Sequence, residues 1–119
     1  MGYMRHHAIV VTGYKRETVK TARTVAVEAG LNPTPLINSP VNGYVSFFIP
    51  PDGSKEGWTD SEMGDARRAA LIEYLDTQRF EDGGSFLDWV EVQYGDDERV
   101  TMVTAHNDED FRTSGDDDE

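Results

Sequence analysis

The segment from Phe47 to Trp58, which reads FFIPPDGSKEGW, combines residue types that could bind a small anion. Glycines such as Gly53 let backbone N–H groups approach a ligand closely, and the N-terminus of the helix expected after the segment favours negative charge. We expect Gly53, Ser54 and Lys55 to hold a phosphate group. Trp58 adds a flat ring on which a base could stack. The segment is therefore a candidate ligand-binding loop.

The same segment has a simpler explanation. It lacks the G-x-x-x-x-G-K-[ST] pattern of a nucleotide-binding P-loop. A turn built on Pro51, Asp52 and Gly53, followed by the start of a helix, accounts for its composition without any ligand. The sequence leaves both interpretations open.

Arg67 is the second candidate because of its place on the helix predicted after the loop. On a 3.6-residue wheel it falls within the apolar half, between Met63 and Leu71. A long cation there must reach a carboxylate, a carbonyl or a ligand, because an unpaired buried charge is costly. We expect Arg67 to pair with the bound phosphate or to form an internal salt bridge. Arg68 lies at the rim of the apolar stripe and is expected to form a surface pair.

The three histidines do not predict a metal site. His6 and His7 begin the first expected strand with side chains on opposite faces, and no Cys, Asp or Glu set with ligand spacing joins them. Two-histidine phosphoesterases use two His-x-Thr/Ser triplets, which neither HHA nor the HND at His106 provides. We expect His7 to contact a ligand or to be structural, and a small phosphoesterase that uses His7 or His106 remains an alternative.

The pattern of apolar residues predicts an α+β fold. The expected elements, in order, are a buried strand in HHAIVVTG, a helix in YKRETVKTARTVAVEAG that stops at Gly30, a poor edge strand in LNPTPLINSP, a hairpin at Asn42-Gly43, a strand in YVSFFI, a helix from Thr59 to about Phe80, and strands in FLDWVEVQYG and RVTMVT. The order matches a ferredoxin-like β-α-β-β-α-β unit with an added C-terminal antiparallel strand. We predict one two-layer sandwich over residues 1–105, with both helices on one sheet face, and an acidic disordered tail at 106–119.

Bulky residues on both sides of the strands predict that the second sheet face needs a cover. The candidates for that face are Phe47, Phe48, Trp89, Val90 and Tyr94. A partner subunit is the simplest cover, so we expect a homo-oligomer.

Charge is unevenly spread along the 119 residues, whose net charge is −12. Residues 1–40 hold five Lys/Arg against two acids, or +3, whereas residues 41–119 hold six against 21, or −15. This balance argues against duplex nucleic acid, which needs phosphate neutralisation. It leaves room for a small anion held by a few cations, or for an acidic inhibitor that occupies a basic site on another protein.

Two absences in the sequence narrow the function further. The chain has no cysteine, which excludes disulfides and Cys-ligated zinc or iron–sulfur clusters, and we expect no cofactor. No segment approaches 18 apolar residues, and the first residues lack the apolar run of a signal peptide. We therefore expect neither export nor a membrane partner, and a cytoplasmic location.

The strings RHHAIVVT, VNGYVSFFIPPDGSKEGW, GDARRA and DWVEVQYGDD resemble small accessory proteins carried by tailed bacteriophages, a resemblance that covers Arg5 to Asp97. It implies a protein made in the infected bacterium that blocks host defence or a host enzyme. Some such proteins look like oligomeric sponges that sequester the cyclic-nucleotide signals of anti-phage systems such as CBASS and Thoeris. The leading prediction is thus a non-catalytic protein that sequesters a nucleotide-like anion, with the host-protein inhibitor and the phosphoesterase as alternatives.

Overall fold

The computed structural model describes residues 6–53, 59–78, 87–95 and 101–107. The elements in this part of the chain are β1 (His6–Gly13), α1 (Arg16–Glu28), β2 (Ile37–Asn38), β3 (Val45–Ile49), α2 (Thr59–Asp76), β4 (Leu87–Tyr94) and β5 (Met102–His106). Each corresponds to an element expected from the sequence. Neither described helix combines the length and the apolarity needed to cross a membrane.

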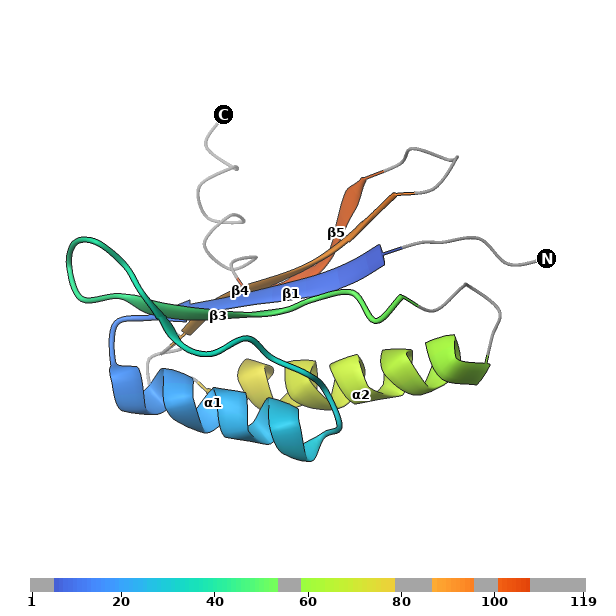
Figure 1. The fold of residues 1–119 in the computed structure, drawn as a ribbon, viewed down its shortest axis with the longest axis horizontal. Coiled ribbons are helices and arrows are strands. Elements are labelled where there is room, and N and C mark those ends of the chain that lie inside the picture. The colour runs from blue at the N-terminus through green and yellow to red at the C-terminus, as the bar shows by residue number, and fades with distance from the viewer. Residues whose placement is uncertain (1–5, 54–58, 79–86, 96–100, 108–119) are drawn as a thin grey trace, which may run out of the picture.

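The strands form one antiparallel sheet in the order β2-β3-β1-β4-β5. Both helices lie against the same face of this sheet, below it in Figure 1, and β5 curves away from the other face. The predicted α+β class, with a five-stranded antiparallel sheet and two helices, is confirmed and is compatible with a two-layer sandwich.

The core lies between the sheet and the helices. Val11 of β1 is paired with Phe47 of β3 on one side and with Trp89 of β4 on the other, and all three side chains are buried. Because paired residues of antiparallel strands point to the same face, these three point toward the helices. The prediction that Phe47 and Trp89 help to form the uncovered face was therefore wrong, because both belong to the core.

The two turn signals in the sequence behave as predicted. Asn42 and Gly43 both have positive φ, of 66° and 68°, as the central pair of a tight hairpin turn requires. Gly30 has a φ of 93° directly after the end of α1, where the N–H of Leu31 donates to the carbonyl of Ala26 at 3.0 Å. This backbone conformation satisfies a carbonyl of the last helical turn and ends α1.

Helix α2 buries only part of the stripe predicted on Met63, Ala66, Ala70, Leu71, Tyr74 and Leu75. The buried positions are Gly64, Arg68, Leu71 and Leu75, while Met63 on the predicted stripe is 44% exposed. Leucines bury far more apolar area than alanines, so Leu71 and Leu75 decide how the helix is rotated. The alanines that widened the predicted stripe are left in solvent. Consequently Arg67 is exposed and Arg68 is buried, the reverse of the prediction.

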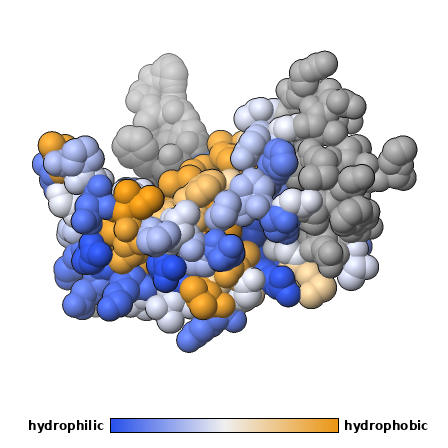
Figure 2. Space-filling model, in the orientation of Figure 1, coloured by the Kyte–Doolittle hydropathy of each residue, from blue (hydrophilic) through white to orange (hydrophobic). Residues whose placement is uncertain are grey.

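Side chains on the other sheet face are only partly covered. Val10 at its centre is 38% exposed, and Val103 on the edge strand β5 is 53% exposed. Phe48 of β3 and Val90 of β4 are both paired with Val10, so they share this face, and both are partly buried. Figure 2 shows an apolar band along the sheet above a mostly hydrophilic helix layer. The disordered tail was predicted from residue 106, but His106 ends β5 and the Asn107 amide donates to the Leu87 carbonyl. The rest of the predicted tail, from position 108, lies outside the described residues.

Candidate functional site

The described part of the predicted loop is its first half. Ser54, Lys55 and Trp58 lie outside the described residues, whereas Gly53 is described. Gly53 has a φ of 81°, and among the described residues other than its chain neighbours no heavy atom lies within 4 Å of the place where its Cβ would be. Backbone conformation, and not crowding, therefore requires glycine at this position. The turn interpretation and the binding-loop interpretation both accommodate this conformation.

The structure brings Arg67 together with the beginning of that loop. A cavity of about 270 Å³, here called the Arg67 pocket, lies where the end of α1, the end of β3 and the first half of α2 meet. Its lining consists of Gly30, Leu31, Asn32, Ile49, Pro50, Pro51, Asp52, Gly64, Arg67 and Arg68. Pro50, Pro51 and Asp52 at the start of the loop thus line this pocket together with Arg67, whereas Gly53, the loop candidate that the structure describes, is not part of the lining.

Arg67 reaches toward the end of α1. A Cβ placed on Gly30 would be 3.0 Å from its Nε atom, so the guanidinium crosses over the glycine that ends the helix. Within the described part of the chain, the Arg67 side chain has no hydrogen bond and no ion pair. Arg67 is thus an exposed cation that supplies uncompensated positive charge to its pocket.

Arg68 forms the internal salt bridge that the sequence suggested for its neighbour. The residue is only 5% exposed. Its Nη1 atom lies 3.8 Å from Asp52 Oδ2, its Nη2 atom bonds Asp65 Oδ1, and its Nε atom lies 3.4 Å from Glu91 Oε2. These carboxylates come from the loop, from α2 and from β4. The burial cost of the guanidinium is offset by opposite charge on three sides.

Glu91 of β4 is held in place by α2 and by the neighbouring strand β5. Its side chain is 14% exposed and faces the helix layer, where it meets Arg68. The hydroxyl of Thr104 on β5 donates to Glu91 Oε1 at 2.8 Å. The ion pair and this hydrogen bond together connect α2, β4 and β5, which indicates a structural role for Arg68 and Glu91.

His7 lies in a different cavity from Arg67. This cavity, of about 500 Å³, is lined by His7, Asp65, Arg68, Ala69, Ile72, Glu73, Asp76, Glu91 and Thr104. Four of these residues are acids and one is arginine, so its charge does not favour an anion. Among the described residues, no group of three or more His, Asp or Glu side chains is placed to hold a metal ion. The predicted grouping of His7 with Arg67 is therefore not present.

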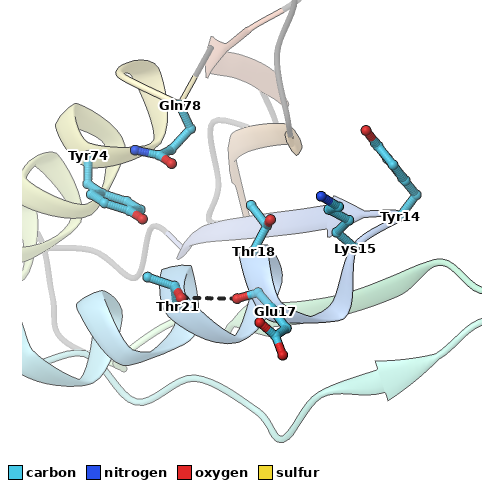
Figure 3. Close-up of a pocket in the computed structure, with 7 residues that line it drawn as sticks. All are labelled: Tyr14, Lys15, Glu17, Thr18, Thr21, Tyr74 and Gln78. Atoms are coloured by element: carbon cyan, nitrogen blue, oxygen red, sulfur yellow. Dashed lines mark hydrogen bonds between the residues drawn. The ribbon is translucent and has the colours of Figure 1, made fainter. Parts of the chain in front are cut away.

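A third cavity, here called the α1–α2 cleft, was not predicted from the sequence. It has a volume of about 360 Å³ and is lined by Tyr14, Lys15, Glu17, Thr18, Thr21, Tyr74 and Gln78. Figure 3 shows Tyr74 and Gln78 of the α2 end facing Thr18 and Thr21 of α1. Burial raises the pKa of Tyr74 above its ordinary value of 10.0. A polar i, i+4 pair, Tyr74 and Gln78, was the available sequence signal.

Comparison with known proteins found no matching family model, curated protein or solved structure. The three cavities described above differ in whether their cations are paired with carboxylates. The Arg67 pocket and the α1–α2 cleft each contain a cation without an ion-pair partner in the described part of the chain, Arg67 in one and Lys15 in the other. The cavity around His7 contains an arginine that carboxylates already neutralise.

Proposed function

We propose that this protein binds a small nucleotide-like anion in the Arg67 pocket and does not convert it. The observation that carries the proposal is the position of Arg67, an unpaired cation beside the Pro50–Asp52 start of the glycine-containing loop. A guanidinium presents parallel N–H donors that match the oxygens of a phosphate or carboxylate. Arg67 is thus the main charged contact of the bound anion.

The charge balance of the pocket supports an anionic ligand. Asp52 also lines the pocket, but its carboxylate faces Arg68 Nη1 at 3.8 Å and not Arg67. Among the described residues, Arg67 is therefore the lining cation that no carboxylate pairs with, and it is the side chain available to an anion. A volume of about 270 Å³ is just below the roughly 300–1,000 Å³ of pockets for drug-sized ligands. This volume favours a ligand of about the size of one nucleotide.

The proposal assigns the rest of the loop to the same ligand. Gly53, Ser54 and Lys55 hold the phosphate through backbone N–H groups and one further cation, and Trp58 stacks the base. What supports this assignment is their sequence position between the described start of the loop and α2. His7 is left out of the proposed contacts because it lines another cavity.

We infer a ferredoxin-like arrangement for β1 to β4 and the two helices, with β5 added at the edge. Its support is that β1 lies between β3 and β4 and that the short β2 pairs with β3. In such a fold the Arg67 pocket lies at the end of the helix layer where the chain passes from β3 to α2.

The wider biological proposal rests on the sequence resemblance. We propose a phage accessory protein of the infected cytoplasm that sequesters a nucleotide signal of host defence as a homo-oligomer. The partly exposed apolar sheet face around Val10 and Val103 supports an oligomer, because a second subunit would cover it. The alternative of an acidic host-protein inhibitor is supported by the exposed Glu73 and Asp76 on α2 and by the −12 net charge.

Titration calorimetry with linear and cyclic adenosine nucleotides tests the proposal. Arg67→Ala should weaken binding more than tenfold, or about 1.4 kcal/mol, relative to the unchanged protein. The matched control is Lys20→Ala, which removes one exposed positive charge from α1 outside all three cavities. Equal affinities for the two variants would place the anion elsewhere.

A second measurement tests whether the protein leaves the bound nucleotide chemically unchanged. The bound nucleotide, released by denaturing the protein after prolonged incubation, should have an unchanged mass. Recovery of a hydrolysed nucleotide would favour the phosphoesterase alternative. Capture of a basic host protein without any nucleotide affinity would favour the inhibitor.

A further inference from the structure

The α1–α2 cleft lies at the opposite end of the helix pair from the Arg67 pocket. Tyr14 and Lys15 come from the segment just before α1, and Thr18 and Thr21 from its first turns. Tyr74 belongs to the last turn of α2 and Gln78 follows that helix. Two antiparallel helices thus form the walls of a cavity of about 360 Å³, which is within the range of small-molecule sites.

The lining of the cleft is unusual for a helix–helix contact. Packed helices normally close with apolar side chains, as Ala22 and Leu71 do in the core. The cleft instead carries two phenols, two threonines, an amide and two charged residues, and none of its seven lining side chains is aliphatic. These polar groups keep the two walls from closing on each other, since each would lose contact with water.

Three of the polar side chains in the cleft are available hydrogen-bond donors. In the described part of the chain, the Lys15 amine and the hydroxyls of Thr18 and Tyr74 have no hydrogen-bond partner. A tyrosine hydroxyl carries its proton at neutral pH, and burial raises the pKa of Tyr74 further, so this hydroxyl is a donor. Thr21 differs, because its hydroxyl donates to the Glu17 carbonyl at 3.0 Å. The cleft therefore suits a ligand that is rich in acceptors.

The charge around the cleft also suits an anion. The first 40 residues, which include all of α1, carry +3 in a chain of −12. Glu17 is the acid in the lining, and Figure 3 shows its carboxylate directed away from the Lys15 amine and the Tyr74 ring. The acids of α2 that line a cavity, such as Glu73 and Asp76, line the one around His7 instead. An anion in the cleft thus meets Lys15 without a facing carboxylate.

Two aromatic rings flank this donor-rich space. Figure 3 shows the Tyr14 ring at one side of the cleft and the Tyr74 ring at the other, with Thr18 between them. Tyr14 is 53% exposed and can approach a ligand, whereas Tyr74 is partly buried against α1. Flat rings on tyrosine gain stacking contacts from a planar ligand in a way that aliphatic side chains do not.

We propose that the α1–α2 cleft is a second binding site, which takes a planar aromatic ring that carries an anionic group, such as a nucleoside monophosphate. Lys15 and Thr18 bind the anionic group, the Tyr74 hydroxyl donates to a ring or sugar acceptor, and the tyrosine rings contact the planar part. This site is independent of the Arg67 pocket and does not rest on the function proposed for that pocket.

Adenosine monophosphate, adenosine and inorganic phosphate are suitable probes, titrated into the Arg67→Ala protein so that the first pocket is impaired. The monophosphate should bind more tightly than either fragment, because only it presents both the ring and the charge. Amide signals of Thr18, Thr21 and Gln78 should shift in two-dimensional NMR spectra. Absence of binding, or shifts confined to other parts of the chain, would overturn the proposal.

Two substitutions identify the contacts in the same background. Lys15→Met should weaken monophosphate binding about tenfold and leave adenosine binding unchanged, and Tyr74→Phe should weaken both about threefold while keeping the ring. Lys20→Met is the matched control for lost charge and should bind as the parent protein. Equal affinities for the Lys15, Tyr74 and Lys20 variants would overturn the site. Every protein compared here carries Arg67→Ala, so these results do not depend on whether the Arg67 pocket binds an anion. The first proposal is tested separately, by comparing proteins with and without Arg67.

Discussion

The Nε atom of Arg68 lies 3.4 Å from Oε2 of Glu91, so an ion pair connects α2 with the central part of the sheet. Glu91 is opposite Ile9 on the central strand, and Arg68 is one turn before Leu71 in the core. Two charges therefore occupy a place where apolar side chains usually lie. They stabilise the fold only as a pair, because either charge alone would be left poorly solvated.

Removing one partner of this pair should be strongly destabilising. We expect Arg68→Met to lower the free energy of unfolding by about 3–5 kcal/mol, because Glu91 loses its buried counter-charge. Asp65→Asn should cost about 1 kcal/mol or less, because the Asp65 side chain is 58% exposed and solvent screens its interaction. Urea unfolding followed by circular dichroism measures both. Similar losses for the two variants would show that Arg68 acts as a surface residue.

Gly64→Ala should stabilise the protein by less than an ordinary replacement of a helical glycine. Such a replacement inside a helix usually stabilises it by about 0.8–1 kcal/mol. A Cβ on Gly64, however, would collide with the carboxylate of Asp52, the end of a flexible side chain that is 45% exposed and faces Arg68. We expect Asp52 to move away from Arg68 and the net gain in the free energy of unfolding to fall below about 0.8 kcal/mol. A gain of the full size in urea unfolding would contradict this placement of the loop against α2.

Tyr74 should be the source of a late transition in an alkaline titration. Burial raises its pKa above the ordinary value of 10.0, so the folded state holds the phenol proton more tightly than the unfolded state. The resulting stability is fully present below pH 10 and is lost as pH rises through the folded pKa. In a titration followed by tyrosinate absorbance, the ionisation step at the highest pH should be absent from Tyr74→Phe and present in Tyr14→Phe. An unchanged titration of Tyr74→Phe would contradict the burial of this hydroxyl.

The uncovered sheet face should mediate self-association. We expect the protein to be at least a dimer in light scattering at micromolar concentration, and Val10→Glu to be a folded monomer, because a charge cannot be buried unpaired between two sheets. Val41→Glu is the control, because Val41 is 66% exposed and precedes the Asn42-Gly43 turn. A monomeric parent protein would remove the subunit interface from the account.

The sequence was most informative where local chemistry decides the structure. Gly30 and the Asn42-Gly43 pair adopt positive φ values that few other residues tolerate, so the helix end and the hairpin were readable. The central strand was also readable, because Ile9 and Val11 belong to an apolar run that only a buried strand accommodates. These features depend on a few neighbouring residues and require no knowledge of the tertiary packing.

The candidate sites were harder to predict because they depend on which way the helices are rotated. A wheel places Arg67 and Arg68 only about 100° apart, and the number of alanines in α2 made its apolar half broad. The large side chains of Leu71 and Leu75 then selected Arg68 for burial. The α1–α2 cleft joins Lys15 to Tyr74 across 59 positions of sequence, a proximity that no local pattern could reveal.

A double-mutant cycle on Lys55 and Arg67, with nucleotide affinity measured by calorimetry and melting curves alongside, tests whether both residues hold one phosphate. We expect Lys55→Ala and Arg67→Ala each to weaken binding more than tenfold, or about 1.4 kcal/mol, and their effects to be non-additive because both contact one phosphate. Arg67→Ala should leave the melting temperature nearly unchanged, because its side chain is exposed. Unchanged affinity in both single variants would contradict the claim and identify the segment after β3 as a turn.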